Sequence, residues 1–212
     1  MKKKIIALLA VTSAVVFASF SLASQADKID SLFLEMKGKY EKAEKLTADK
    51  KAPILAKDSQ NKVKVMAEEF VKYKANKEFM SQMNGQKLAQ SNQELLEEML
   101  KNELVIEHAL SLGVTVSEDE LTSYINQERE ILMDPNLDKN MKKILENLIK
   151  KSGLTEEEYW KSEETRELYK RNLITTKLAL QLQINFEGYQ KLANELYEKA
   201  ELELDTESLN QL

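Results

Sequence analysis

The sequence predicts an all-α protein, a helical bundle of about six helices with a long C-terminal helix and an extended N-terminal helical arm. Only 5 glycines and 2 prolines occur among the 212 residues, whereas folds built from strands need frequent turn residues. Charged residues make up 32% of the chain, and apolar residues recur between them at helical spacing. There is no cysteine, which excludes a disulfide-stapled or zinc-thiolate fold.

Residues 1–26 have the pattern of a secretory signal peptide. Lysines at positions 2–4 precede an apolar run up to about Phe20, and small residues follow it. Because this run is shorter than the ~20 residues of a comfortable membrane span, we expect cleavage after Ala23 or Ala26. The expected location is extracytoplasmic, either secreted or in the cell envelope. An uncleaved anchor is the alternative, and membrane contact would then involve this segment alone.

Loss of the signal peptide makes the chain more acidic. It removes three of the 31 basic residues and no acidic residue, which leaves 28 basic against 36 acidic residues and changes the formal net charge from −5 to −8. Such a chain repels phosphate backbones on average, so we expect no nucleic-acid partner. The absence of cysteine also excludes the lipid-modified cysteine of a bacterial lipoprotein.

Residues 27–90 are expected to form the N-terminal helical arm. Its first helix should end before Pro53, because proline lacks the amide donor that a helix interior needs. A second helix is expected from about Asp58 to Gly85. The apolar residues of the first helix recur at spacings of three and four and so share one face: Ile29, Phe33, Met36, Tyr40 and Ala43.

Residues 91–204 are expected to form a helical domain whose helices begin at capping boxes. In a capping box, a hydroxyl accepts a hydrogen bond from the first turn while a carboxylate three residues later reaches back to the cap residue. Helix ends are expected near Gly113, Pro135 and Gly153. The three boxes are Ser91 with Glu94, Ser117 with Glu120, and Thr155 with Glu158.

The last helix of this domain is expected to run from about Glu156 to Glu203. At 1.5 Å per residue it would be ~70 Å long, which exceeds the size of a compact domain of this length. It must therefore project, kink or break, and we expect the weak points at Thr175–Thr176 or Gly188. Residues 205–212 lack a periodic apolar pattern, so we expect a flexible tail.

The reactive side chains argue against an enzyme. A single histidine, His108, and no cysteine exclude a Cys–His nucleophile pair and a multi-histidine metal site. His108 is interpreted as a partly exposed surface residue, with a pH-sensitive contact as the alternative. Glu103 falls in an apolar helix face, where a carboxylate is more often ion-paired than catalytic. Residues 134–138 lack the glycine of an EF-hand loop and predict a turn. We expect no catalytic residue, no metal and no cofactor.

One apolar stripe is a candidate for binding a partner. Met66, Phe70, Tyr73 and Met80 fall on one side of the second helix, and flexible thioethers and flat rings adapt to varied apolar ligands. At helical spacing such a stripe is also typical of ordinary core, and the first helix could cover it. We predict these four residues as the peptide-binding site.

Two segments resemble the N-terminal domain of SurA-type and PrsA-type secretion chaperones. Residues 95–121 match the family's leucine-rich helix, its Gly-x-x-Val-Ser turn and a helix opened by acids, and GLTEEEYW at 153–160 matches its later Gly-Leu-Thr turn. KVMAEEF at 64–70 is similar to the lead-in to the family's first helix. The resemblance covers about residues 62–180. It implies a chaperone domain for exported proteins, and the chain has no room for the family's parvulin prolyl isomerase domain.

Three hypotheses for function follow. The first is an ATP-independent extracytoplasmic chaperone that binds apolar segments of unfolded or partly folded exported proteins, without isomerase activity. The second is a structural or adaptor protein whose first and last helices form a coiled coil with a second copy, a homodimer, or with a partner of the cell envelope. The third, a carboxylate-dependent hydrolase, would need a pair of inward carboxylates, and the sequence offers only Glu103.

Overall fold

The structure is a computed structural model that describes residues 26–48 and 53–212. The predicted signal peptide therefore lies outside the described residues, apart from its last position. The described residues form nine helices and three short strands, so the all-α prediction is confirmed. None of these helices combines the length and the apolar character that a membrane crossing requires. The helices are α2 (Ala26–Ala48), α3 (Ala67–Met83), α4 (Asn92–Ser111), α5 (Glu118–Leu132), α6 (Lys139–Ser152), α7 (Glu156–Lys161), α8 (Glu163–Leu182), α9 (Phe186–Lys199) and α10 (Thr206–Asn210).

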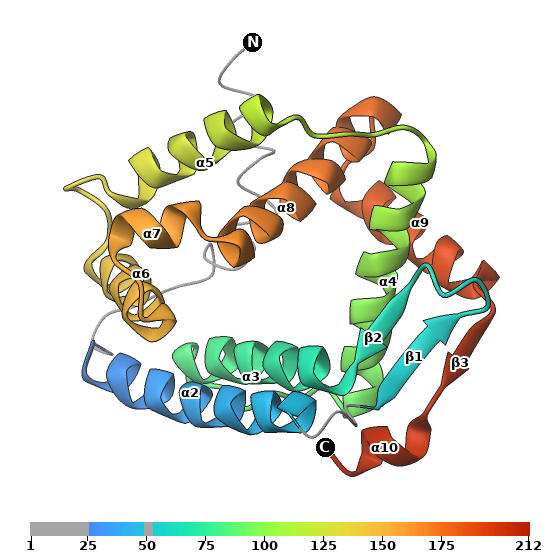
Figure 1. Ribbon diagram of the computed structural model, residues 1–212, viewed down its shortest axis with the longest axis horizontal. Helices are drawn as coiled ribbons and strands as arrows, with labels where there is room; N and C mark the ends of the chain where they lie inside the picture. The colour runs from blue at the N-terminus through green and yellow to red at the C-terminus, as the bar shows by residue number, and fades with distance from the viewer. Residues whose placement is uncertain (1–25, 49–52) are drawn as a thin grey trace.

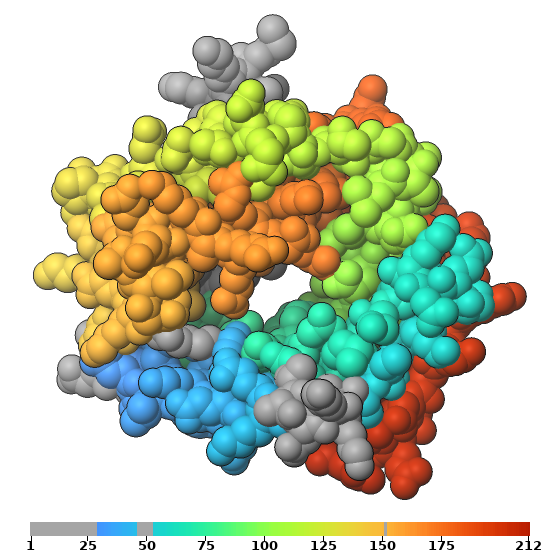
Figure 2. All heavy atoms as spheres, viewed as in Figure 1, coloured from blue at the N-terminus to red at the C-terminus, as the bar shows by residue number. Residues whose placement is uncertain are grey.

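The helices are arranged as a ring around a central opening. Figure 1 shows α2 and α3 side by side along one edge, α4 on the next side, α5 and α8 opposite α3, and α6 and α7 on the remaining side. The space-filling view in Figure 2 shows that side chains leave the centre open. The ring closes where α6 meets α2, because Ile144 packs against the buried Ile29 and Lys143 pairs with Asp30 at 3.0 Å.

A small antiparallel sheet replaces the predicted start of the second helix. Its strands are β1 (Ile54–Asp58), β2 (Lys64–Met66) and β3 (Leu202–Leu204), in the order β2-β1-β3. The prediction of a helix from Asp58 is therefore wrong, and α3 begins nine residues later at Ala67. The Asp58 carboxylate accepts a hydrogen bond from the Val63 N–H at 2.9 Å, and this contact closes the turn between β1 and β2.

The last predicted helix is broken into α7, α8 and α9. The breaks lie at Ser162 and at Gln183–Asn185, and not at Thr175–Thr176, which are inside α8, or at Gly188, which is in the first turn of α9. Each break is a cap: the Ser162 hydroxyl accepts from the Thr165 N–H and the Asn185 amide oxygen accepts from the Gly188 N–H. Side chains of this kind satisfy the backbone donors of a new helix start and so compete with continuation of the old helix.

The C-terminal segment packs back onto the beginning of the described chain. β3 pairs with β1, and Leu209 of α10 is buried in the same core cluster as Leu55 and Phe70. The Asp205 carboxylate caps α10 by accepting from the Ser208 N–H at 3.0 Å. The prediction of a flexible tail is corrected here, because Leu209 and Leu212 pack against this cluster and Asn92 donates to the Leu209 carbonyl at 3.1 Å.

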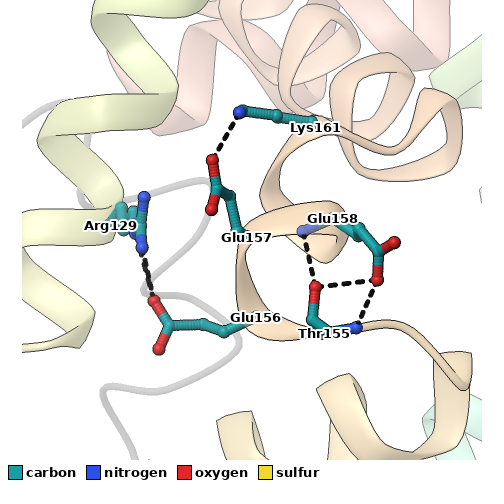
Figure 3. Close-up of polar contacts among 6 residues, drawn as sticks. All are labelled: Arg129, Thr155, Glu156, Glu157, Glu158 and Lys161. Carbon is teal, nitrogen blue, oxygen red and sulfur yellow. Dashed lines mark hydrogen bonds and ion pairs between the residues drawn. The ribbon is translucent and has the colours of Figure 1, made fainter.

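The three predicted capping boxes are confirmed at the starts of α4, α5 and α7. Figure 3 shows the third: the Thr155 hydroxyl accepts from the Glu158 N–H at 3.3 Å, and the Glu158 carboxylate accepts from the Thr155 N–H at 2.8 Å. The same view shows Arg129 of α5 donating to Glu156 of α7 at 2.6 Å, which fixes the corner between these two helices.

Candidate functional site

The four residues predicted to bind a peptide do not form one surface. Phe70 is fully buried in the core between the sheet and α4, so it cannot contact a partner, and the prediction is corrected there. Met80 packs against the cluster that joins α2, α3 and α6. Met66 ends β2, and its N–H donates to Glu69 at 2.8 Å. Only Tyr73, which is half-buried, lines a cavity. The stripe is divided because α3 is covered by α2 on one side and by the sheet and α4 on another.

A cavity lies next to Tyr73, and we call it the inner groove. It has a volume of about 620 Å³ and lies between α3, α4, α8 and the first turn of α9. Helices α3, α4 and α8 also border the opening seen in Figure 2. Its apolar wall consists of Tyr73, Met99, Ile106, Leu168, Phe186 and Tyr189.

Two large apolar side chains of this wall face solvent. Leu168 of α8 is 56% exposed and Phe186 at the start of α9 is 55% exposed. Single exposed apolar residues are ordinary on protein surfaces, but these two line the same groove as the half-buried Tyr73 and Tyr189. The inner groove therefore offers a contiguous apolar surface to a ligand.

Charged residues of the inner groove are neutralised in pairs. Lys77 of α3 donates to Glu98 of α4 at 2.6 Å, and Arg171 of α8 donates to Glu103 of α4. Glu103 is therefore ion-paired, in agreement with the interpretation from the sequence. The two pairs join α3 to α4 and α4 to α8, so they hold the walls of the groove together without leaving a net charge between them.

The surroundings of Glu98 keep this carboxylate ionised. Burial alone would raise the pKa of Glu98, but hydrogen bonds from Lys77, Gln90 and Tyr73 outweigh burial and lower that pKa. Burial of the Tyr73 hydroxyl, together with the nearby Glu98 carboxylate, raises the pKa of Tyr73. At neutral pH the groove thus presents an ionised, paired carboxylate and a neutral phenol.

Three neutral polar groups in the groove lack partners. Within the described part of the chain, the side-chain amides of Asn102 on α4 and Asn172 on α8 make no hydrogen bond. The hydroxyl of Thr176 on α8 is also without a partner, although this residue is only 5% exposed. Its neighbour Thr175 donates its hydroxyl to the Asn172 carbonyl at 2.9 Å. The groove therefore combines an apolar wall with unused hydrogen-bonding groups.

The other residues that the sequence marked as chemically interesting lie apart from the inner groove. His108 is half-buried in the last turn of α4. The Asp134 carboxylate accepts from the Asn136 N–H at 2.7 Å within a turn, and Asp138 caps α6, so the interpretation of this segment as a turn is confirmed. Among the described residues, no three His, Cys, Asp or Glu side chains lie close enough together to hold a metal ion.

Sequence reasoning missed most of the groove. Leu168 and Phe186 lie on different helices, and no local sequence pattern connects them. Asn102 and Asn172 are 70 positions apart in the sequence. The local signals were Tyr73 in the predicted stripe and Glu103, which stood out as a charged residue on an apolar helix face. Its partner Arg171 marks the opposite wall.

No protein-family model matches this chain, and comparisons with curated proteins and with solved structures give no match. The resemblance to SurA-type and PrsA-type chaperones therefore stays a prediction that depends on the residues quoted above.

Proposed function

We propose that the protein is an ATP-independent extracytoplasmic chaperone that binds apolar segments of unfolded or partly folded exported proteins in the inner groove. The observation that carries this proposal is the apolar wall, in which Leu168 and Phe186 remain more than half exposed beside Tyr73. The function requires no prolyl isomerase activity, no cofactor and no metal. Localisation outside the cytoplasm rests on the sequence of residues 1–26.

The groove suits weak and reversible binding of unfolded chains. Burial of apolar surface stabilises a complex by roughly 25 cal/mol per Å², without directional requirements, so many different sequences are accepted. Release then occurs by simple dissociation, and no nucleotide is needed. The acidic chain, with a formal net charge of −8 once residues 1–26 are removed, keeps the loaded complex soluble by electrostatic repulsion between copies.

The adaptor hypothesis needs helices that are not free in this structure. The apolar face of α2, with Ile29, Phe33 and Met36, is buried against α3 and α6. The last predicted helix is divided into three shorter helices and does not offer a long coiled-coil surface. A homodimer through these helices would require the ring to open first. The hydrolase hypothesis lacks support as well, because the groove carboxylates Glu98 and Glu103 are each paired with a basic side chain.

The direct test is suppression of aggregation. Denatured citrate synthase is diluted into buffer without ATP, and light scattering is followed with and without a several-fold molar excess of the purified protein. We expect scattering to fall strongly with the protein present. In the variant Leu168→Ala/Phe186→Ala, which removes the exposed part of the wall, we expect most of this protection to be lost.

A matched control removes the same number of exposed apolar side chains from another part of the surface. Leu34 of α2 and Ile131 of α5 are also more than half exposed but do not line the inner groove, so Leu34→Ala/Ile131→Ala should protect as well as the unaltered protein. No protection by the unaltered protein, or equal loss in both double variants, would contradict the proposed function.

The proposed location has a separate test. Residues 1–26 fused to alkaline phosphatase, which is active only after export, should give phosphatase activity in bacterial colonies. Replacing the lysines at positions 2–4 by glutamates should abolish most of that activity, because the positive charge precedes the apolar run in the export pattern. An inactive fusion would contradict an extracytoplasmic location.

A further inference from the structure

Positive charge is concentrated on one helix of this acidic chain. Helix α6 contains five lysines and one glutamate, a formal charge of +4 over 14 residues. Of the 28 basic and 36 acidic residues that follow position 26, the remaining 23 basic and 35 acidic residues have a formal charge of −12. No other described helix has a formal charge above +1. The composition of the whole chain therefore conceals a strongly basic element.

The lysines of α6 gather on the side that faces away from the ring. The opposite side of this helix is apolar and is fixed within the ring, because Ile144 packs against α2 and α3 and Leu145 packs against α5 and α7. At 3.6 residues per turn, four lysines and Glu146 fall on the other side, which we call the basic face. Its lysines are Lys139, Lys142, Lys143 and Lys150.

Three of these four lysines are not neutralised within the described part of the chain. Lys143 forms an ion pair with Asp30 of α2 at 3.0 Å. The Lys142 ammonium donates to a backbone carbonyl at 2.5 Å, and this neutral acceptor leaves its charge uncompensated. After the charge of Glu146 is subtracted, the basic face keeps a net charge of +2. The lysines without an ion pair are Lys139, Lys142 and Lys150.

The basic face lies next to the point where α2 begins. Asp30, near the start of α2, contacts both the Lys143 ammonium at 3.0 Å and the Asn147 amide at 3.2 Å. The apolar run of the predicted signal peptide ends at about Phe20, and α2 begins at Ala26. A chain of this length reaches at most about 20 Å. A bilayer that holds the apolar run, during export or in an uncleaved anchor, therefore lies close to the basic face.

The spacing of the lysines fits an extended surface better than one small anion. Lys139 and Lys150 are 11 residues apart, about 16 Å along the helix, so they cannot converge on a single phosphate group. An anionic bilayer presents many phosphate groups in one plane and attracts clustered lysines within a Debye length of ~8 Å. Over longer distances the acidic helices across the ring, such as α4, are screened.

We infer that the basic face of α6 binds the surface of an anionic phospholipid bilayer, with Lys139, Lys142 and Lys150 as the contacting residues. The contact is weak and sensitive to salt, since each lysine near such a surface strengthens binding about fivefold. It adds to any contact made by residues 1–26, and it keeps the ring at the membrane from which exported chains emerge. The inference goes beyond the proposed function and does not depend on the inner groove.

The test is co-sedimentation of the purified protein with lipid vesicles. One set of vesicles mixes phosphatidylglycerol with phosphatidylcholine, and the other contains phosphatidylcholine alone. We expect several-fold tighter binding to the vesicles with phosphatidylglycerol at low salt, and we expect this preference to disappear at high salt, where the Debye length is shorter.

Substitutions then assign the contact to α6. Lys139→Glu/Lys150→Glu should weaken binding to the phosphatidylglycerol vesicles by more than about tenfold, and Glu146→Lys should strengthen it several-fold, a gain that loss of folding cannot produce. The matched control Lys191→Glu/Lys199→Glu makes the same change of charge at two exposed lysines of α9, across the ring from α6 (Figure 1), and should leave binding almost unchanged. Residues 1–26 are the same in every variant, so any affinity of their own cancels in the comparison.

The outcomes separate this inference from the proposed function. Equal binding to the two kinds of vesicle, or an equal loss in the α6 and α9 double variants, would overturn the inference. Lys139→Glu/Lys150→Glu should still protect citrate synthase, because neither lysine lines the inner groove. Failure of the lipid test therefore leaves the proposed function standing, and absence of protection by a protein that binds the vesicles would contradict the proposed function alone.

Discussion

Two regions of the molecule, the α2–α3 contact and the inner groove, are built from the same kinds of residues. They differ in whether apolar side chains fill them. Between α2 and α3, the rings of Phe33 and Phe79 lie 4.5 Å apart at their centroids, and both side chains are buried. In the inner groove, Leu168 and Phe186 line one cavity, and each is more than half exposed. One region is a closed core, and the other is an apolar surface held open.

The change from closed to open takes place within a single helix. On α8, Ile174 and Leu178 are buried against α4, whereas Leu168, less than two turns earlier, is 56% exposed. The Arg171–Glu103 pair lies between these two parts of the helix. The ring is thus held by its closed contacts, and the open surface contributes little to folding. Substitutions in the two regions should separate stability from binding.

The largest effect on stability is expected for Phe79→Ala in the closed core. Removing a buried aromatic ring leaves a cavity and costs about 3–5 kcal/mol in the free energy of unfolding. Urea unfolding followed by circular dichroism measures this cost. The control is Leu34→Ala on the neighbouring helix α2, where the side chain is 72% exposed and the change should stay within about 0.5 kcal/mol. Similar values for the two variants would show that α2 does not pack as described.

The next largest effect on stability is expected at Thr175 and Thr176, where the same substitution should change the free energy of unfolding in opposite directions. Thr176→Val should raise the free energy of unfolding by about 1 kcal/mol, because the buried hydroxyl has no partner, whereas Thr175→Val should lower it by about 1 kcal/mol, because its hydroxyl donates to the Asn172 carbonyl. The same urea experiment applies to both variants. A loss of stability in Thr176→Val would mean that this hydroxyl is satisfied inside the protein.

The free energy of unfolding should depend on pH through Glu98, which lines the groove. The pKa of Glu98 is lowered on folding, so its ionised carboxylate stabilises the folded protein. This stabilisation is fully present above about pH 4.5, the ordinary pKa of the group, and is lost as the pH falls through the folded-state pKa. Glu98→Gln should therefore reduce the acid-induced loss of stability, measured as urea midpoints between pH 7 and pH 3.

Glu128 of α5 is the matched control for that pH dependence. Burial raises the pKa of Glu128, so folding is favoured by its protonated form and this contribution is lost as the pH rises through the folded-state pKa. Glu128→Gln should consequently stabilise the protein at pH 7, the opposite sign to the effect of Glu98→Gln. The same sign in both variants would contradict the assigned environments.

The smallest effect on stability is expected in the groove itself. Leu168→Ala should change the free energy of unfolding by less than about 0.5 kcal/mol, since most of this side chain is in contact with solvent. A cost near that of Phe79→Ala would show that the groove is closed in solution and is part of the core.

The local features of the fold could be predicted from the sequence, and the long-range ones could not. The capping boxes at Ser91, Ser117 and Thr155 depend on residues three positions apart, so each was predicted with its helix start. The pairing of β1 with β3 was missed because β3 lies about 150 residues later and no local pattern reveals it. The hairpin of β1 and β2 is local, and its turn at Asp58 was overlooked in the sequence. The caps at Ser162 and Asn185 were present in the sequence but were overlooked.

The groove was beyond prediction for a related reason. An apolar stripe at helical spacing, such as Phe70 with Tyr73, indicates that a helix face is apolar but not whether another element covers it. Exposure of Leu168 and Phe186 is decided by the path of α8 and α9 around the ring, which depends on contacts between distant helices. Only the structure distinguishes an apolar face that is buried from one that remains open.

The most direct test of the inner groove as the binding site uses the absence of native cysteine. Leu168→Cys introduces a single thiol in the groove, and Leu34→Cys introduces one at an apolar position on α2 that is even more exposed to solvent. Each is labelled with benzophenone-maleimide and irradiated in the presence of denatured citrate synthase. We predict a strong crosslink to the client from position 168 and little from position 34. Equal crosslinking from the two positions, or a stronger crosslink from position 34, would contradict binding in the groove.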